Sequence, residues 1–250
     1  MKQSALHHFH RTPRDQRLAK LKTSDHFASM ADKGQIKQTV LDLLESVSSF
    51  AATFNPLFGI VTKLVGAAKK GVVDDDTIKL DKDFQQIHEK LECISEQNKQ
   101  LLDQIHTDEI NKNYGNLEKN IKHQYQGFKN MVENIRGDPE KSELYREDFK
   151  NIYRENDGHQ NLNRYYDAIM EDEGAFGKLL LKIYLEHYKK NKKIMEAKCS
   201  HLAYIFHIGL IALMAYYVVT EDDEDEFREE WGQKVFNIQT KMQEVLKECN

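Results

Sequence analysis

The feature that most constrains this chain is the apolar run at residues 202–219, which reads LAYIFHIGLIALMAYYVV. As an α-helix this run would be about 27 Å long, close to the roughly 30 Å thickness of the hydrocarbon layer of a bilayer. A helix that is apolar on all its faces lies either in a membrane or at the centre of a helical bundle. The run predicts one of these two environments for Leu202, Tyr204, Phe206, His207, Gly209, Leu210, Leu213, Tyr216 and Val219.

A second apolar segment, residues 50–68, reads FAATFNPLFGIVTKLVGAA and contains one charged residue, Lys63. Pro56 in its middle is expected to kink or restart a helix, because proline lacks the backbone N–H that an interior helical position donates. The two apolar segments would either pack as ordinary core or form a hairpin that a soluble bundle hides and releases onto a membrane. The residues of this second segment that we expect to lie in the membrane or the core are Phe50, Phe54, Pro56, Phe58, Ile60 and Leu64.

The remaining sequence favours long amphipathic helices, because it contains only 3 Pro and 12 Gly and has few β-branched runs. Between residues 84 and 105 apolar residues recur with a period close to seven, interrupted by Asn98. One helix over residues 81–135 would be roughly 80 Å long, about twice the width of a compact domain of this size, so we expect a bend at residues 107–116. The expected fold class is all-α, an elongated multi-helix bundle with long amphipathic helices and one strongly apolar helix.

The domain organisation follows from a change in composition near residue 30. Residues 1–29 are basic and poor in apolar side chains, which predicts a disordered leader. Residues 30–250 are expected to form a single helical domain. Within it we expect N-terminal helices at 30–136, middle helices at 137–200, the apolar helix at 201–219 and an amphipathic helix at 220–250, with a clear break at Gly137 to Glu140.

Charge and cysteine content narrow the functional classes. The net charge is -5, so the chain as a whole has no basic excess to neutralise a nucleic-acid backbone. Three widely spaced cysteines, Cys93, Cys199 and Cys249, fit neither a disulfide framework nor a zinc site. The start of the chain has no apolar signal-peptide core, and no Asn-X-Ser/Thr acceptor is present. We therefore expect an intracellular protein, with membrane association left open, that is not classically secreted.

The spacings that catalysis requires are missing from the sequence. It contains no phosphate-binding loop, no dinucleotide fingerprint, no His-Glu-X-X-His and no Cys-X-X-Cys. His7, His8 and His10 form the nearest metal-like group, but they lie in the basic leader. We expect no enzymatic activity, no cofactor and no metal.

His207 is the unusual side chain of the apolar run, because an ionisable group there is costly unless it is neutral and hydrogen-bonded. One interpretation is a neutral histidine satisfied by a neighbouring helix. The other is a pH switch, in which protonation below about pH 6.5 destabilises the packed state. Lysines at 189–198 precede the run and acids at 221–226 follow it; these are either solvated ends or charges that orient the helix at a lipid surface.

Part of the sequence resembles the rapunzel family of fish proteins. The segment DFQQIHEKLECISEQNKQL carries Phe84, His88, Lys90, Leu91, Ile94 and Ser95 in the family's pattern, after an N-terminal apolar segment that contains Pro and Gly. The resemblance covers roughly residues 30–250. It implies a role in fin and skeletal development, a membrane protein and no known biochemical activity. The arrangement is also similar, in architecture alone, to α-helical pore-forming toxins.

Two functions are therefore expected as alternatives. The first is a non-enzymatic, membrane-associated helical protein of the rapunzel type, with pore-forming-like insertion of its apolar helices. The second is a soluble helical bundle that acts as a protein-interaction module. The partners would be a lipid membrane, a second copy of the chain or a protein that the sequence does not identify, and nucleic acid is not expected.

Overall fold

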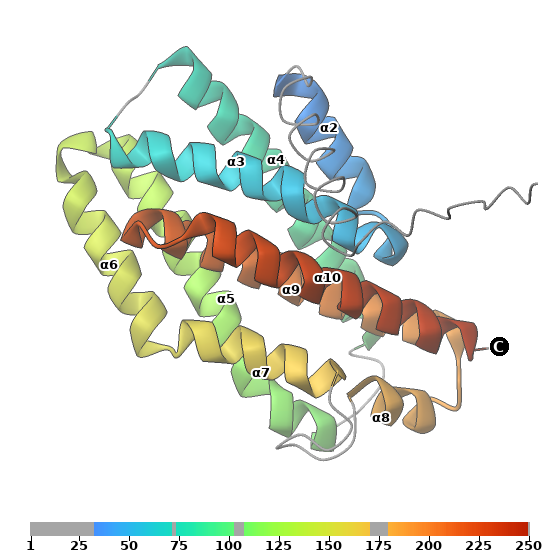
Figure 1. Ribbon diagram of the computed structural model, residues 1–250. Helices are drawn as coiled ribbons and strands as arrows, with labels where there is room; N and C mark the ends of the chain where they lie inside the picture. Colours follow the sequence, from blue (N-terminus) through green and yellow to red (C-terminus); the bar gives the residue numbers. More distant parts are fainter. Residues whose placement is uncertain (1–32, 72–73, 103–107, 171–179, 250) are drawn as a thin grey trace, which may run out of the picture. The chain divides into compact units, whose positions relative to one another are not determined.

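The computed structural model describes residues 33–71, 74–102, 108–170 and 180–249 (Figure 1). The chain divides into two units, Met1–Ile36 and Lys37–Asn250, and the bundle described below is formed by the second. The described residues are helical and contain no strand, so the predicted all-α class is confirmed. The expected boundary between residues 29 and 30 lies outside the described residues. The elements are α2 (Lys33–Leu43), η1 (Val47–Ser49), α3 (Phe50–Lys69), α4 (Asp75–Leu102), α5 (Asp108–Gly137), η2 (Pro139–Lys141), α6 (Ser142–Glu155), α7 (Gly158–Met170), α8 (Leu180–His187), α9 (Lys192–Thr220) and α10 (Glu224–Lys247).

Helix α9 forms the core of the bundle. It packs chiefly against α3, α4 and α5, and α10 runs alongside both α3 and α9 (Figure 1). From residue 202 to residue 215 every side chain of α9 is buried. The helix also begins ten residues before the apolar run, at Lys192, so its first three turns are built from residues of the preceding lysine-rich segment.

Helix α3 is continuous through Pro56, so the helix does not restart there. Proline at this position removes the hydrogen bond to the carbonyl of Ala52, four residues earlier. Ala52 is exposed and Pro56 is half-buried, so water can reach the carbonyl that loses its partner. The restart predicted at Pro56 is therefore wrong, because the solvent side of the helix tolerates the missing bond.

Helices α4 and α5 form the expected antiparallel pair. Asp81 pairs with Arg136 at 2.8 Å, and Phe84 meets Phe128 edge-on with ring centroids 5.5 Å apart. The bend predicted in residues 81–135 is thus confirmed, but its position is not. Residues 107–116 were expected to break the helix, whereas α5 has already begun at Asp108.

The helices begin and end where local capping residues lie. The side chain of Asp74 accepts a hydrogen bond from the backbone N–H of Thr77 at 2.7 Å, and α4 begins directly after Asp74, at Asp75. Asp157 adopts φ 50° between α6 and α7, and Gly158 begins α7. A Cβ atom at Gly158 would lie 2.4 Å from the ring of Tyr153, so this close approach requires glycine.

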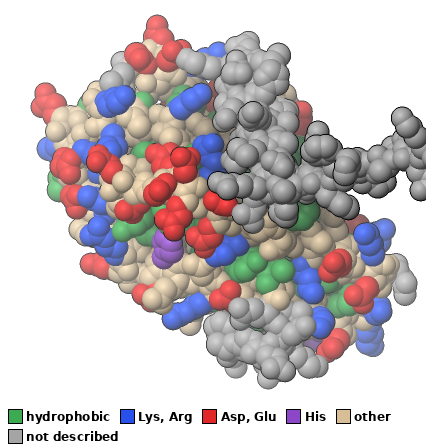
Figure 2. Space-filling view, in the orientation of Figure 1, with side chains coloured by type: hydrophobic (Ala, Val, Ile, Leu, Met, Phe, Trp, Pro, Cys, Tyr) green, Lys and Arg blue, Asp and Glu red, His purple; other side chains and the backbone are tan. Residues whose placement is uncertain are grey.

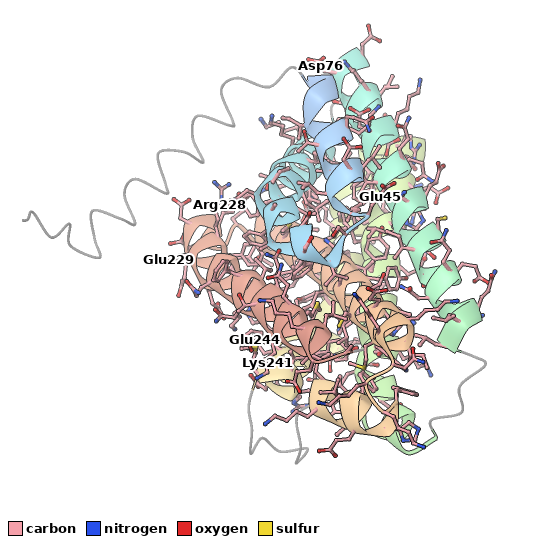
Figure 3. The ribbon with its side chains drawn as sticks, turned by 90° about the vertical axis from the view of Figure 1, so that its right-hand side faces the viewer. Glu45, Asp76, Arg228, Glu229, Lys241 and Glu244 are labelled. Carbon is pink, nitrogen blue, oxygen red and sulfur yellow. The ribbon has the colours of Figure 1, made fainter. Side chains whose placement is uncertain are left out.

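The covering helices are amphipathic, and α10 shows the pattern clearly. Glu229 and Glu244 project from its outer side into solvent (Figure 3). Its inner side contributes the buried residues Phe227, Trp231, Val235, Ile238, Met242 and Val245. Helix α10 thus has one buried and one exposed side, and it lies within residues 220–250, where an amphipathic helix was predicted.

Gly209 allows α9 to approach α5 and α7 closely, and we expect Gly209→Ala to destabilise the bundle. A Cβ atom there would lie 2.6 Å from Leu162 Cδ1 and 3.1 Å from Ile121 Cγ2. We expect a loss of about 1–3 kcal/mol in the free energy of unfolding, measured by urea denaturation.

Gly66→Ala in α3 is the matched control, because a Cβ atom at Gly66 meets no atom within 4 Å. It should raise the free energy of unfolding by about 0.5–1 kcal/mol through helix propensity. Equal effects of the two substitutions would contradict the close packing at Gly209.

Candidate functional site: the polar contacts of helix α9

Both ends of α9 are defined by local hydrogen bonds. The side chain of Asn191 accepts from the backbone N–H of Ile194 at 3.2 Å and caps the first turn. Glu221 adopts a left-handed conformation with φ 62°, and its N–H donates to the carbonyl of Tyr217. The helix therefore stops abruptly where the acidic segment begins.

The structure buries nearly all the residues predicted to lie in a membrane or a core. Tyr216 is half-buried, and the other eight residues predicted for the apolar run are buried. In the second segment Pro56 is half-buried and the other five residues are buried. In this closed bundle α9 is thus covered by protein, as the core alternative required.

Phe50 brings the two apolar segments into direct contact. Its ring lies 6.3 Å from that of Phe206 and makes an edge contact with the imidazole of His207 at 4.9 Å between centroids. Phe50 is 1% exposed and Phe206 is 0% exposed. The start of α3 therefore packs directly on the middle of α9.

His207 forms a polar contact inside this apolar interface. Its Nε2 atom lies 2.8 Å from Thr53 Oγ1, and the hydroxyl of Thr53 donates to the carbonyl of Phe50 at 2.6 Å. The imidazole and the Thr53 hydroxyl therefore share one hydrogen bond, whose donor depends on the tautomer of the ring. Burial lowers the pKa of His207 to about 4, although the carbonyl of Ala203 opposes this shift.

A second polar contact lies two turns earlier on α9. Glu118 of α5 accepts hydrogen bonds from the hydroxyl of Tyr165 at 2.8 Å and from Nε2 of His201 at 3.0 Å. Burial raises the pKa of Glu118, but the hydrogen bonds from His201 and Tyr165 outweigh it, so the pKa is lowered overall. Lys198 is buried beside this group, and its ammonium lies 4.7 Å from the centre of the Tyr184 ring. Burial lowers the pKa of this lysine.

Other polar groups of α9 also find partners on the covering helices. Asn98, the polar interruption of the seven-residue pattern, donates to the hydroxyl of Ser200 at 3.0 Å. Near the C-terminal end, Tyr216 accepts from Arg154 Nε at 3.0 Å and stacks on Tyr153 at 4.4 Å. Together with His207 and His201, these polar groups connect α9 to α3, α4, α5 and α6.

The sequence did not identify Glu118, Tyr165, Lys198 and His201 as a group. Each lies on a separate stretch of charged or amphipathic sequence, and no short motif joins α5 with α7 and α9. One signal was available: Lys198 and His201 are three residues apart, so they share a face of the helix that enters the apolar run.

No metal site is formed by the described part of the chain, where no group of three or more His, Cys, Asp or Glu side chains could hold an ion. His7, His8 and His10 lie outside the described residues. Two helical segments are long and apolar enough to cross a membrane by length and composition alone, Val47–Lys69 and Lys192–Thr220. In the bundle, 50% and 89% of their most apolar stretches are buried.

Two comparisons with known proteins agree with this architecture. A family model for the cephalotoxin-like middle helical domain matches residues 73–250. Protein rapunzel of Danio rerio is 36% identical over 217 residues, which cover 87% of this chain and 93% of the relative. The chain belongs to the rapunzel family. No solved structure matches it.

The segment through which the chain resembles the rapunzel family lies on α4, where its residues contact several other elements. Phe84 packs against Phe128, and Lys90 pairs with Glu45 at 2.6 Å. His88 lies between the hydroxyl of Tyr125 at 3.0 Å and the ammonium of Lys129 at 3.1 Å. Leu91 is fully buried, whereas Ile94 and Ser95 are half-buried. In this rapunzel-family chain the pattern therefore joins α4 to α5 and to the segment after α2.

The burial of His207 predicts a pH dependence of stability. The unfolded chain binds a proton at His207 near the ordinary pKa of 6.5, and the folded bundle binds it only near 4. The contribution of His207 to the free energy of unfolding is therefore complete above pH 6.5, falls as the pH drops towards 4 and then levels off. We expect acidification across this range to lower the free energy of unfolding by about 3 kcal/mol.

Urea unfolding of the wild type and of His207→Leu, followed by circular dichroism over this pH range, measures the effect. The variant should lose most of the pH dependence. His123→Gln, which removes an exposed histidine of α5, should keep it. An unchanged slope in His207→Leu would show that other groups cause the acid sensitivity.

Proposed function

We propose that this rapunzel-family chain is a non-enzymatic, intracellular protein that associates with membranes, and that α3 and α9 enter a lipid bilayer after the bundle opens. A role in fin and skeletal development accompanies this proposal, because the family resemblance implies it. The similarity to a cephalotoxin-like helical domain is compatible with a protein that exchanges a closed bundle for a membrane-bound form.

The observation that supports this proposal most is that the two helices with membrane-spanning length and composition pack against each other. Helices α3 and α9 share an extensive contact in which Phe50 and Phe206 meet. A bilayer interior can replace the apolar surroundings that both helices have in the bundle. The covering helices would then turn their own apolar stripes towards the lipid interface.

The polar groups of the two helices are few and have low charge. His207 is neutral in the bundle because burial lowers its pKa to about 4. Lys198 lies near the beginning of α9, four residues before the apolar run, where a long side chain can reach the headgroup region. Lys63, the one charge in the apolar segment of α3, is exposed in the bundle, and its long side chain can also extend towards the headgroup region.

A soluble protein-interaction module is the alternative function. The burial of 89% of the most apolar stretch of α9 supports it, because a helix covered by its own chain has no need of lipid. Under this alternative the bundle stays closed, and its exposed helix faces bind a protein partner or a second copy.

The deciding experiment places a charge on α3 rather than α9. A side chain at Gly209 would disrupt the closed bundle itself, so a substitution there cannot separate the two functions. Gly59 lies at the middle of α3, and a Cβ atom there meets no atom within 4 Å. The closed bundle should therefore tolerate both Gly59→Asp and the matched control Gly59→Asn.

Purified protein would be mixed with phosphatidylcholine vesicles at pH about 7 and about 5, floated, and extracted with alkaline carbonate. We expect a carbonate-resistant fraction of the wild type, and a marked loss of that fraction in Gly59→Asp because a carboxylate at the centre of a membrane helix costs about 3 kcal/mol. Gly59→Asn should retain more of it. Absence of a carbonate-resistant fraction at both pH values would favour the soluble module. Equal insertion of both variants would contradict the entry of α3 into the bilayer.

A further inference from the structure

The turn between α8 and α9 presents a concentrated positive charge. Lys189, Lys190, Lys192 and Lys193 occupy four of five consecutive positions, with the helix cap Asn191 between them. All four lysines are exposed, and the turn from residue 189 to residue 193 contains no acidic residue. The four lysine side chains take no part in the polar contacts of α9 described above.

The backbone of the lysine turn is tight and well defined. Lys189 and Lys190 adopt φ values of 50° and 61°, in the left-handed region that favours glycine or asparagine. The N–H of Lys190 donates to the carbonyl of Leu185 at 3.1 Å, and the N–H of Asn191 donates to that of Tyr188 at 3.0 Å. Lysine is therefore present at two positions whose backbone conformation favours glycine or asparagine.

Helix electrostatics also disfavour two of these lysines. Lys192 and Lys193 are the first two residues of α9, where the positive end of the helix dipole favours acidic side chains. Lys189 and Lys190 follow the C-terminal end of α8, where cations are favourable, but α8 has only 8 residues. Residues that conflict with local preferences without a compensating contact are expected at functional positions.

Neighbouring acids do not neutralise the lysine turn. Lys190 pairs with Glu248 at 3.8 Å, and both side chains are about half exposed, so solvent screens this pair. Within the part of the chain that the structure describes, Lys189, Lys192 and Lys193 have no ion pair. Glu186 and Glu196 are the nearest acids along the sequence, and exposed Lys247 adds further positive charge at the C-terminal end of α10, next to Glu248.

The opposite end of α9 has the opposite charge. Residues 221–226 are all acidic, and Figure 2 shows Asp and Glu side chains gathered over the first turns of α10. Helix α9 therefore begins at a basic surface and ends at an acidic one, with its apolar run between them. Only one of these two ends is attracted to an anionic surface.

We propose that the lysine turn is the surface by which the closed bundle docks on an anionic phospholipid membrane, with the start of α9 directed towards the lipid. This inference rests on the proposed membrane association and names its first step. Several lysines on one exposed turn fit a membrane carrying phosphatidylserine or similar headgroups, because the attraction sums over many lipids and needs no shaped pocket. The acidic end of α9 then faces away from the membrane.

The test compares the full-length wild type with a variant carrying Lys189, Lys190, Lys192 and Lys193 all changed to Gln. A control variant has the same change in net charge at four exposed lysines of α4 and α5, Lys79, Lys82, Lys99 and Lys119. Cosedimentation would use vesicles of phosphatidylcholine with and without phosphatidylserine, at low and high sodium chloride. Thermal unfolding of all three proteins checks that the closed bundle is retained.

We expect the wild type and the control to bind phosphatidylserine vesicles more tightly than phosphatidylcholine vesicles, and the turn variant to bind them about tenfold or more weakly. High salt should release this binding. Equal loss in both variants would overturn the proposal, and so would stronger competition by inorganic phosphate than by chloride at equal ionic strength, since that indicates a discrete phosphate site. Carbonate-resistant insertion into vesicles that contain phosphatidylserine, if unaffected in the turn variant, would overturn the docking step and leave the proposed function standing. Salt-released binding without any carbonate-resistant fraction would support docking and reject insertion.

Discussion

The structure depends on one constraint, a helix of 29 residues whose central half has no polar face. Every side of that stretch needs an apolar neighbour, so the chain surrounds it with α3, α4, α5 and α10. The long amphipathic helices are a consequence, because each can cover one side of α9 and keep its other side in water. The same requirement explains why residues distant in sequence, such as Phe50 and Phe206, come into contact.

Apolar packing alone would not determine how α9 is rotated within its surroundings, because its faces are nearly equivalent. The polar contacts supply that information. His207, Ser200 and His201 of α9 each contact a polar partner on a different helix. The partners are Thr53 of α3, Asn98 of α4 and Glu118 of α5. A rotation or a shift of α9 would leave several buried polar groups without partners. The few polar residues therefore specify the arrangement, while the apolar residues provide most of the driving force.

Much of the fold could be predicted from the sequence, because the apolar run, the periodic stripes and the break at Gly137 are local signals. The helix restart predicted at Pro56 was wrong because water can reach the carbonyl of Ala52. That exposure depends on which side of α3 faces the bundle, which the sequence does not show. The predicted position of the bend, residues 107–116, was wrong because polar composition is a weak guide to where a helix ends. The contact between Glu118, Tyr165 and His201 could not be predicted, because it arises only when α5, α7 and α9 are packed together.

The recognised helical domain begins at residue 73, whereas α3 ends at Lys69. Yet α3 supplies Thr53 and Phe50, which cover His207 and the middle of α9. The domain is therefore not self-sufficient in this chain: a fragment starting at residue 73 would retain the central helix but uncover one of its sides. A related chain that keeps the domain and replaces the preceding segment needs another apolar helix to cover this side of α9. The segment before the domain is therefore the part through which such chains can diverge in stability.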